Sequence, residues 1–169
     1  MQKRKKFGGE VWWMKFKIVA IGGTFDHIHK GHQVLLEKAF ECGEKVIIGV
    51  TSDNFLAKLG KVVENRYEER VRKLQEYLLA KYSAERFEIQ PLDDYFGPGI
   101  YREEVEALVA STETASRVEI ANKRRLELGL KPLEVIVVDM VLAEDGKPIS
   151  SSRIRMGVID AEGRVKRVE

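Results

Sequence analysis

The sequence predicts an α/β fold in which helices cover both faces of a five-stranded parallel sheet. Three observations support this prediction. Five short runs of β-branched and other apolar residues recur along the chain, segments with helical spacing of apolar residues alternate with them, and no internal repeat interrupts the pattern. A length of 169 residues is typical of one domain. We therefore expect a single domain over residues 14–169, preceded by a basic extension over residues 1–13.

In the first half of the chain, three predicted strands alternate with three helical segments. The strands are expected at residues 17–21 (KIVAI), 45–50 (KVIIGV) and 86–92. The first two are apolar runs of the kind found in strands that are buried on both faces of a sheet. The helical segments are residues 31–42, a short helix that begins at Ser52 or Asp53 and ends at Lys58, and residues 67–82.

The second half contains two further strands and two helical segments. A turn-rich segment, DDYFGPG at residues 93–99, ends the third strand. The remaining strands are expected at residues 105–110 and 133–142, and the remaining helices at residues 113–128 and from Ser150 onward. Ligands bind such sheets beyond the carboxyl ends of the strands, so we look for chemistry in the loops that follow the strands.

Composition excludes several classes of protein. The 29 lysine and arginine residues nearly balance the 27 aspartate and glutamate residues, so the chain is no bulk polycation of the kind that binds nucleic acids or membrane surfaces. No apolar run approaches the roughly 18 residues that a membrane span needs. The single cysteine, Cys42, forms no internal disulfide, and no Cys/His cluster has the spacing of a zinc site. These features predict a cytoplasmic protein without a protein-bound metal, whose partners are neither nucleic acids nor membranes.

The loop after the first predicted strand concentrates residues suited to binding phosphate. It reads GGTFDHIHKGH and contains all three histidines of the chain, at positions 27, 29 and 32. Gly22 and Gly23 let a phosphate approach the backbone, and the start of the following helix offers free N–H groups and a favourable dipole. Imidazolium groups at positions 29 and 32 can share one face and donate hydrogen bonds to the same anion. A metal site is less favoured, because no further His or Cys ligand is available.

A second candidate segment lies near the other end of the chain. Ser150, Ser151 and Ser152 stand at the start of the last predicted helix, and Arg153 and Arg155 follow them. Hydroxyl groups at a helix start can donate to phosphate oxygens, while an arginine adds charge. Serine runs are common in loops, so this segment gains weight only in combination with the histidine loop.

Both segments resemble known signatures. GGTFD followed by HKGH is similar to the GTFD and H-x-G-H motifs of the class I nucleotidyltransferase superfamily, and ISSSRIR at residues 149–155 resembles its I-S-S-[ST]-x-I-R motif. Between these motifs, the chain resembles the phosphopantetheine adenylyltransferase family of archaeal and eukaryotic type. The resembling stretches cover nearly all of residues 17–163 and are IGVTSDNFLAK, YEERVRKLQEYL, IQPLDDYFGPG, VASTETA, NKRRLELGLKPLEV and AEDGKPISSSRIRMGVIDAEG. The arginine-rich loop that bacterial members carry after the third strand has no counterpart here.

The resemblance implies a Rossmann-like nucleotidyltransferase fold and a specific reaction. In that reaction, the adenylyl group of ATP is transferred to 4′-phosphopantetheine, which gives dephospho-coenzyme A and pyrophosphate in coenzyme A biosynthesis. The expected small-molecule partners are ATP and 4′-phosphopantetheine, with Mg²⁺ accompanying ATP. The attacking phosphate is already mostly ionised near neutral pH, so no general base is required. The residues implied as catalytic are His29, His32 and Lys58.

The same resemblance implies further site residues. Those expected to bind ATP are Gly23, Thr24, Phe25, His32, Ser111, Glu113, Ser150, Ser151, Ser152 and Arg153. Those expected to bind the acceptor are Thr24, Lys58, Lys61, Asp93 and Asp94. Lys58 and Lys61 are alternatives for one cation. Two aspartates in a turn are usually turn formers, and helix capping fits Ser111 and Glu113 as well as ATP binding does. Asp26 is interpreted as a structural cap rather than a magnesium ligand.

Other functions share the two end motifs. A glycerol-phosphate cytidylyltransferase, a choline-phosphate cytidylyltransferase and an FMN adenylyltransferase carry both of them, so only the middle segments argue against these enzymes. An aminoacyl-tRNA synthetase fragment is a second kind of alternative, disfavoured because the chain carries a serine motif instead of the lysine loop of those enzymes. A non-catalytic nucleotide-binding regulatory module is a third kind, disfavoured because His29, His32 and the serine motif occur together. The sequence does not define the oligomeric state.

Overall fold

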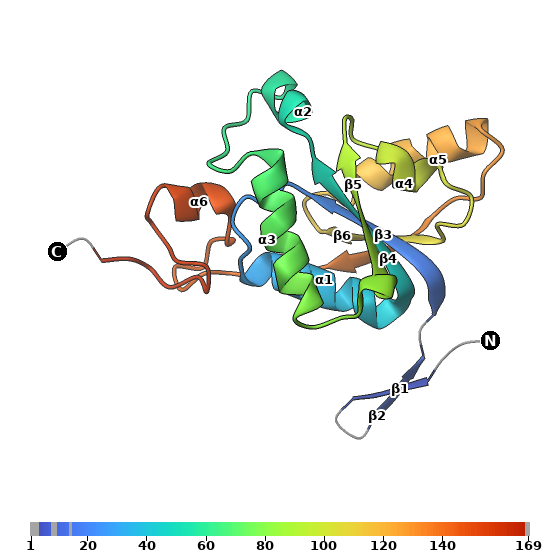
Figure 1. Cartoon of the computed structure of the whole chain (residues 1–169), viewed down its shortest axis with the longest axis horizontal. Coiled ribbons are helices and arrows are strands. Elements are labelled where there is room, and N and C mark those ends of the chain that lie inside the picture. The colour runs from blue at the N-terminus through green and yellow to red at the C-terminus, as the bar shows by residue number, and fades with distance from the viewer. Residues whose placement is uncertain (1–3, 8–9, 14, 168–169) are drawn as a thin grey trace.

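The computed structural model describes residues 4–7, 10–13 and 15–167. Five parallel strands form the central sheet in the order β5-β4-β3-β6-β7 (Figure 1), which confirms the predicted fold class. Their bounds are Phe16–Gly23 (β3), Gly43–Thr51 (β4), Phe87–Leu92 (β5), Ala107–Ser111 (β6) and Glu134–Val138 (β7). The strand order reverses between β3 and β6. The switch point, where such sheets bind ligands, therefore lies at the carboxyl ends of these two strands.

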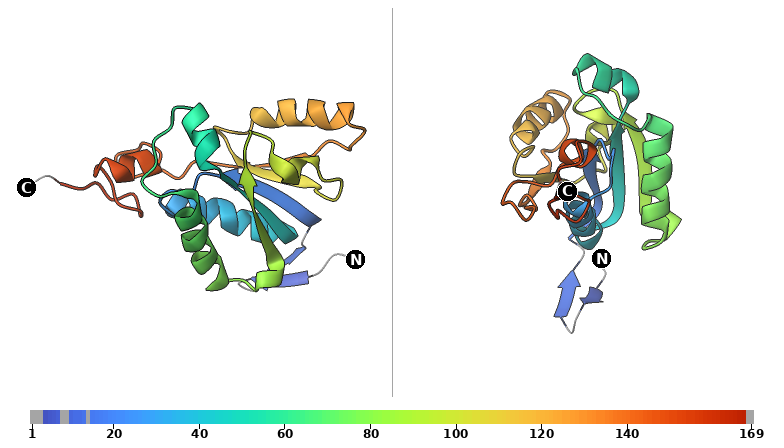
Figure 2. Two further views of the ribbon diagram at one scale, coloured as in Figure 1. Left: turned by 45° about the horizontal axis from the view of Figure 1, so that its top comes forward. Right: turned by 90° about the vertical axis from the view of Figure 1, so that its left-hand side faces the viewer.

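Helices cover both faces of this sheet. α1 (Lys30–Cys42) and α3 (Tyr67–Leu79) pack on one face, and α4 (Gly97–Tyr101) and α5 (Arg117–Glu127) pack on the other. The right-hand view in Figure 2 shows the sheet between α3 and α5. The short elements are α2 (Asp53–Lys58), a 3-10 helix (Ala84–Arg86) and α6 (Ser151–Arg155). None of the helices within the described ranges has both the length and the apolar character needed to cross a membrane.

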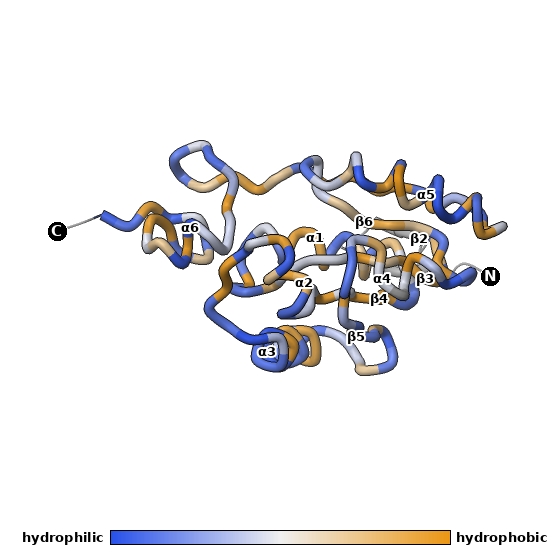
Figure 3. Tube along the Cα trace, turned by 90° about the horizontal axis from the view of Figure 1, so that it is seen from above, coloured by the Kyte–Doolittle hydropathy of each residue, from blue (hydrophilic) through white to orange (hydrophobic). Residues whose placement is uncertain are grey.

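Alternation along the strands divides the hydrophobic core into two layers. On β3, Val19 and Ile21 belong to the layer under α1 and α3, whereas Ala20 belongs to the layer under α4 and α5. On β4, Ile48 and Ile47 divide in the same way. Figure 3 shows hydrophobic residues gathered along these strands, between α3 and α5. Because both faces of the central strands are buried, their sequences are continuously apolar, and this is why they are predictable.

Two helix boundaries differ from the predicted ones by three residues or more. α5 begins at Arg117 rather than at residue 113, because the chain first turns after β6: the backbone N–H groups of Thr114 and Ala115 both donate to the Ser111 carbonyl. α3 ends at Leu79 rather than at residue 82. The turn after β6 keeps residues 112–116 at the carboxyl edge of the sheet.

The helix α4 is an element that the sequence did not predict, since only turns were expected over residues 93–99. Asp94 Oδ1 accepts hydrogen bonds of 2.8 Å from the backbone N–H groups of both Phe96 and Gly97, which fixes the entry to the helix. Gly97 has a φ of +55°, and a Cβ there would collide with Leu92. Glycine and proline lower the helix propensity of this segment, but proline is tolerated in the first turn of a helix.

Two segments lie outside the sheet. Within the predicted extension, β1 (Arg4–Phe7) and β2 (Glu10–Trp13) pair as an antiparallel hairpin, which Figure 1 shows apart from the sheet. At the other end, β7 stops at Val138 rather than at residue 142, and the chain that follows folds around a small apolar cluster of Ala143, Ile149 and Ile159. The Lys30 N–H donates to the Ala161 carbonyl over 2.9 Å. This contact ties the C-terminal segment to the start of α1.

Candidate active site

The loop between β3 and α1 starts at the switch point. Thr24 directly follows β3, and its hydroxyl lies 3.2 Å from the Thr51 hydroxyl, which donates to the Gly23 carbonyl over 3.1 Å. Phe25 has a φ of +54°, a left-handed conformation that costs a residue other than glycine roughly 1–3 kcal/mol. Its side chain is 2% exposed, and this burial offsets the cost. A Cβ at Gly23 would lie 3.0 Å from the Phe25 ring, so the loop needs glycine there.

His29 and His32 form a reciprocal cap at the start of α1. The His32 backbone N–H donates to Nδ1 of His29 over 3.4 Å, and the His29 backbone N–H donates to Nδ1 of His32 over 3.3 Å. The two rings are stacked, with their centroids 3.7 Å apart. A neutral imidazole that accepts at Nδ1 carries its proton on Nε2. Both rings are therefore held in the tautomer that can donate an Nε2–H to a ligand.

Both of these imidazoles are neutral near pH 7, which corrects the expectation of imidazolium groups. Burial, together with the charge of His27, lowers the pKa of His29 to about 4. Burial and the neighbouring His29 lower the pKa of His32 to about 3, although hydrogen bonding to the His27 backbone opposes this. Gly31 makes the stacked arrangement possible, because a Cβ there would lie 2.9 Å from Cε1 of His29.

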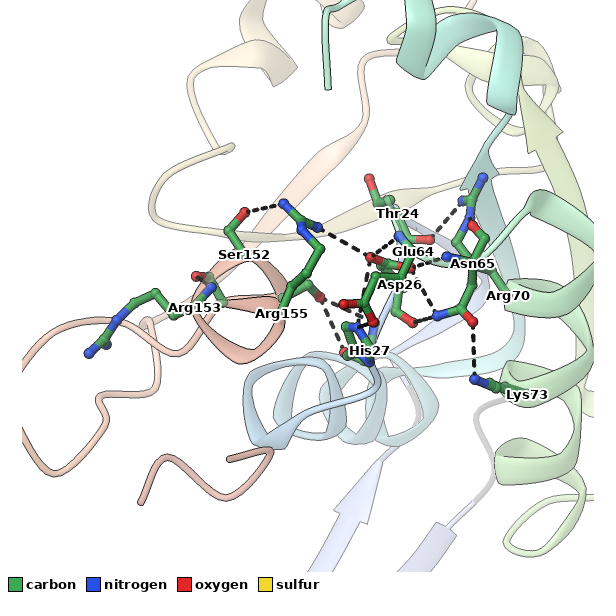
Figure 4. A network of polar contacts seen from close by, with 12 residues as sticks. Thr24, Asp26, His27, Glu64, Asn65, Arg70, Lys73, Ser152, Arg153 and Arg155 are labelled. Atoms are coloured by element: carbon green, nitrogen blue, oxygen red, sulfur yellow. Dashed lines mark hydrogen bonds and ion pairs between the residues drawn. The ribbon is translucent and has the colours of Figure 1, made fainter. Parts of the chain in front are cut away.

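Asp26 is a buried carboxylate, 2% exposed, that joins three segments of the chain (Figure 4). Oδ1 accepts from the backbone N–H and the side-chain amide of Asn65, over 2.9 and 3.0 Å. Oδ2 accepts from the Glu64 N–H over 3.0 Å and from Arg155 over 3.3 Å. Burial raises the pKa of Asp26, but the hydrogen bonds from Glu64 and Asn65 together lower it by more than burial raises it. The pKa of Asp26 therefore lies below its ordinary value. These contacts fit the interpretation of Asp26 as a structural cap, since it accepts the backbone N–H groups of residues 64 and 65, just before α3.

Arg70, on α3, binds backbone carbonyl groups at the same edge of the sheet. Its side chain is fully buried, and its guanidinium donates to the carbonyl oxygens of Thr24, Thr51 and Asn65 over 2.9, 2.7 and 3.0 Å. It also pairs with the Asp53 carboxylate over 2.9 Å. Arg70 thus joins the ends of β3 and β4 to α2 and to the segment before α3. Sequence reasoning missed this residue.

Two cavities open at this edge and share a border. The first, of about 260 Å³, is lined mainly by apolar side chains of β4, β5, β6, α2 and α4. Its polar lining residues are Thr24, Thr51, Lys61, Gln90, Asp94, Thr114 and Arg117. The second, of about 290 Å³, is lined by Thr24, Asp26, Leu56, Lys61, Val62, Val63, Ser151, Ser152 and Arg155. We call them the apolar cavity and the polar cavity. Thr24, Leu56 and Lys61 line both.

The serine segment reaches the polar cavity at two of its three hydroxyls. Ser150 caps α6 by accepting the Arg153 N–H over 3.2 Å. The Ser151 hydroxyl accepts from the His27 N–H and donates to the His27 carbonyl, each over 3.3 Å, which fastens α6 to the histidine loop. Ser151 and Ser152 line the polar cavity. These contacts bring the two signature segments together.

The two arginines of this segment point in different directions (Figure 4). Arg153 pairs with Asp145 and donates to the Pro148 carbonyl over 3.1 Å, away from the polar cavity. Arg155 lines that cavity and lies 3.3 Å from Asp26. Of the two arginines, Arg155 and not the expected Arg153 therefore lines the polar cavity, together with Lys61.

The remaining predicted residues fall into two groups. Lys61 lines both cavities, and Asp94 lines the apolar cavity in addition to fixing the start of α4. Lys58, Asp93, Ser111 and Glu113 line neither cavity, and the same holds for the predicted residues Phe25, His29, His32, Ser150 and Arg153. Of the two lysines considered for one role, Lys61 is thus the one at the shared border. Within the described ranges, no group of three or more His, Cys, Asp and Glu side chains is placed to hold a metal ion.

Comparisons with known proteins place the chain among nucleotidyltransferases. Residues 20–157 match a family model described as cytidylyltransferase-like. The phosphopantetheine adenylyltransferase of Methanothermobacter thermautotrophicus is 45% identical over 151 residues, which cover 89% of this chain and 90% of the relative. That of Methanopyrus kandleri is 42% identical over 146 residues, which cover 86% of this chain and 92% of the relative.

A solved structure is similar over most of the chain. The crystal structure of a protein of unknown function from Archaeoglobus fulgidus is similar, with a TM-score of 0.64 and 31% identity, over 73% of this chain and 90% of that chain. The matched region of this chain contains the histidine loop and the serine segment that border the two cavities. The chain belongs to the phosphopantetheine adenylyltransferase family, within the cytidylyltransferase-like nucleotidyltransferases.

Proposed function

We propose that this protein transfers the adenylyl group of ATP to 4′-phosphopantetheine, forming dephospho-coenzyme A and pyrophosphate. The observation that carries the proposal is the shared border of two unlike cavities at Thr24 and Lys61. The polar cavity, with its serines and Arg155, suits a triphosphate. The apolar cavity suits an extended, uncharged arm. The two reacting phosphates have to meet between them, at the shared border.

The reaction needs positioning more than proton transfer. An oxygen of the 4′-phosphate attacks the α-phosphorus of ATP, the bond between that phosphorus and the bridging oxygen to the β-phosphorus breaks, and pyrophosphate leaves with the electron pair. A phosphate monoester has a second pKa of about 6, so the nucleophile is largely ionised near pH 7. Catalysis then consists of holding the phosphates in line and stabilising the charge that develops on them.

We assign His29 and His32 to hydrogen-bond donation toward the ATP phosphates. Their Nδ1 atoms are occupied by the reciprocal cap, so each ring offers its Nε2–H. Donors that are fixed before the substrate arrives need no reorganisation as charge develops in the transition state. The backbone of Gly23, Thr24 and Phe25 leads directly into this position and orients the attacking phosphate at the border.

Positive charge comes from two other side chains. Lys61 stands at the border of the two cavities, where it neutralises charge on the reacting phosphates. Arg155 and the hydroxyls of Ser151 and Ser152 surround the polar cavity, where the β- and γ-phosphates bind. Arg155 also contacts Asp26, and this contact holds its guanidinium at the cavity. Arg153 keeps a structural role at the start of α6.

Mg²⁺ is expected to accompany ATP and to be held by phosphate oxygens and water. The carboxylate nearest the polar cavity, Asp26, already accepts four hydrogen bonds, which use the lone pairs that a metal would need. The ion, when bound, shields the charge of the triphosphate. The side chains described above bind and orient the phosphates themselves.

The test is a reaction of the purified protein with ATP, Mg²⁺ and 4′-phosphopantetheine. Dephospho-coenzyme A is measured by chromatography with mass detection, and pyrophosphate by a coupled assay, and we expect the two in equal amounts. Parallel reactions with CTP, glycerol phosphate and FMN cover the cytidylyltransferase and flavin alternatives, which the named relatives do not favour. Turnover of FMN or glycerol phosphate without turnover of 4′-phosphopantetheine contradicts the proposal.

A further inference from the structure

Gln90 lies in the floor of the apolar cavity. It is on β5, in register with Gly49 of β4, which is in register with Gly22 of β3. All three residues line the cavity. Because the two glycines have no side chain, there is space above the sheet at these positions. The Leu92 side chain fills part of this space, and the cavity takes the rest. Most of the lining is apolar. A ligand group that lies next to Gln90 therefore has to form a hydrogen bond with its amide.

The neighbouring Glu88 fixes how the Gln90 amide is oriented. The two residues are two positions apart on β5, so their side chains lie on the same face of the sheet. The Gln90 amide donates from Nε2 to Oε1 of Glu88. A carboxylate accepts hydrogen bonds and donates none, so the group that faces Glu88 must be the NH₂ of the amide. The amide oxygen is consequently turned away from Glu88 and stays available as an acceptor.

Two cations keep Glu88 ionised. Arg102 donates from one nitrogen to both carboxylate oxygens over 3.1 and 3.2 Å, and the Lys45 ammonium lies 3.5 Å from the carboxylate. Burial raises the pKa of Glu88, but hydrogen bonds from Gln90 and Arg102 and the charges of Arg102 and Lys45 lower it below its ordinary value. Flipping the Gln90 amide would bring its oxygen against a carboxylate oxygen. The orientation of the amide is therefore preset before any ligand binds.

We propose that the Gln90 amide oxygen accepts a hydrogen bond from an amide N–H of the acceptor's arm and so selects an acceptor that carries an amide. This inference rests on the proposed function, since 4′-phosphopantetheine contains two secondary amides. An amide N–H that enters an apolar cavity loses its water and needs a new acceptor. Conversely, an arm without an amide leaves the Gln90 oxygen unpaired on binding, which penalises that arm.

The first test replaces the amide and keeps the length of the side chain. Gln90→Met should raise the KM for 4′-phosphopantetheine about three- to tenfold, the value of one neutral hydrogen bond, and leave the KM for ATP unchanged. Each KM is measured with the other substrate saturating, and the midpoint of thermal unfolding is measured to verify folding. An unchanged KM for 4′-phosphopantetheine, or an equal rise in both KM values, overturns the proposal.

A second variant gives a signature that a structural role would not produce. Gln90→Glu places a second carboxylate beside Glu88. The pKa of the introduced carboxylate is raised because like charges repel. Near pH 8 both groups are ionised, and the KM for 4′-phosphopantetheine should exceed that of Gln90→Met. Toward pH 6 the introduced group takes up a proton, donates it to Glu88 and turns a carbonyl oxygen to the cavity. The ratio of its KM to the wild-type KM should then fall.

At each pH, the KM of Gln90→Glu is compared with those of the wild type and of Gln90→Met. The titration of the substrate phosphate affects all three proteins equally and so cancels from the KM ratios. The other charged groups near this side chain are identical in all three proteins. They are Lys45 and Arg102 beside Glu88, and Lys61, Asp94 and Arg117 on the cavity lining. For Gln90→Met the ratio should stay constant with pH. A ratio that is also constant for Gln90→Glu overturns the proposal.

Glu104→Gln is the matched control. Glu104 pairs with the same Arg102 over 2.7 Å but is exposed and makes no contact with Gln90, so we expect wild-type KM values. The two levels of inference fail differently. If the wild type does not convert 4′-phosphopantetheine, the proposed function fails. If it does and Gln90→Met keeps the wild-type KM, only the role of Gln90 fails.

Discussion

Replacing Arg70 by methionine tests whether this buried guanidinium holds the candidate active site together. Methionine fills a similar apolar volume along α3 but donates no hydrogen bond. The substitution removes the donor from the carbonyl oxygens of Thr24, Thr51 and Asn65 and the partner from the Asp53 carboxylate. Thr24 belongs to the border of the two cavities, so both stability and catalysis should respond.

The magnitude follows from the number of groups left without a partner. Each buried or partly buried carbonyl that loses its donor costs about 1 kcal/mol, which gives about 3 kcal/mol for the three. The Asp53 carboxylate adds little, because it is 45% exposed and water can solvate it. With a urea m-value of about 2 kcal/mol/M, a loss of about 3 kcal/mol moves the unfolding midpoint down by roughly 1.5 M.

The assay is urea unfolding followed by circular dichroism, together with kcat and KM for both substrates under native conditions. Arg72→Met is the matched control, because Arg72 lies on the same helix but is exposed and pairs only with Glu69 and Glu76. We expect it to leave the midpoint close to that of the wild type. A change below about 1 kcal/mol in Arg70→Met would refute the argument that the buried carbonyls depend on this side chain.

Further outcomes are expected at the phosphate-binding residues. His32→Ala should lower kcat about tenfold or more, since a preset donor is removed, and near-normal turnover would refute its catalytic role. Lys61→Ala should lower kcat/KM at least tenfold and Lys58→Ala should not, as measured in the same initial-rate assay. Arg155→Ala should raise the KM for ATP more than that for 4′-phosphopantetheine. Because the folded-state pKa values of His29 and His32, about 4 and 3, lie below the unfolded value of 6.5, unfolding takes up protons. The free energy of unfolding should therefore fall as the pH drops from 7 toward 4, and urea titrations should show a shallower fall in His29→Gln.

Most of the fold could be predicted because its signals are local. The strands β3 and β4 are buried on both faces, so their apolar runs identify them without knowledge of the rest of the chain. The errors occur where specific side-chain contacts override the helix propensity of the residues. α4 forms from a Gly-Pro-Gly segment because Asp94 fixes its first turn and Gly97 packs against Leu92, and neither contact follows from helix propensity.

The candidate site shows the same division. His29, His32 and Ser151 belong to short motifs whose spacing is visible in the sequence, and all three lie at the histidine loop or beside the polar cavity. Arg70 looks like one more charge in a charged helix. The available signal is its spacing, three residues after Tyr67 and four before Leu74, which puts it on the helix face that packs against the core.

The choice of Arg155 over Arg153 could not be made from the motif. Both arginines belong to the same short segment, and either could contact a phosphate bound there. The choice is decided by two aspartates, one eight residues before Arg153 and one in the distant histidine loop. Asp145 captures Arg153, and Asp26 holds Arg155 at the polar cavity. Donors from residues 64 and 65 occupy the remaining lone pairs of the Asp26 carboxylate. Asp26 therefore holds Arg155 at the cavity but has no free lone pair with which to bind a metal ion. In the proposed reaction, the neutral histidines would act as hydrogen-bond donors, and the positive charge that the triphosphate needs would come from Lys61, Arg155 and the metal ion that accompanies ATP.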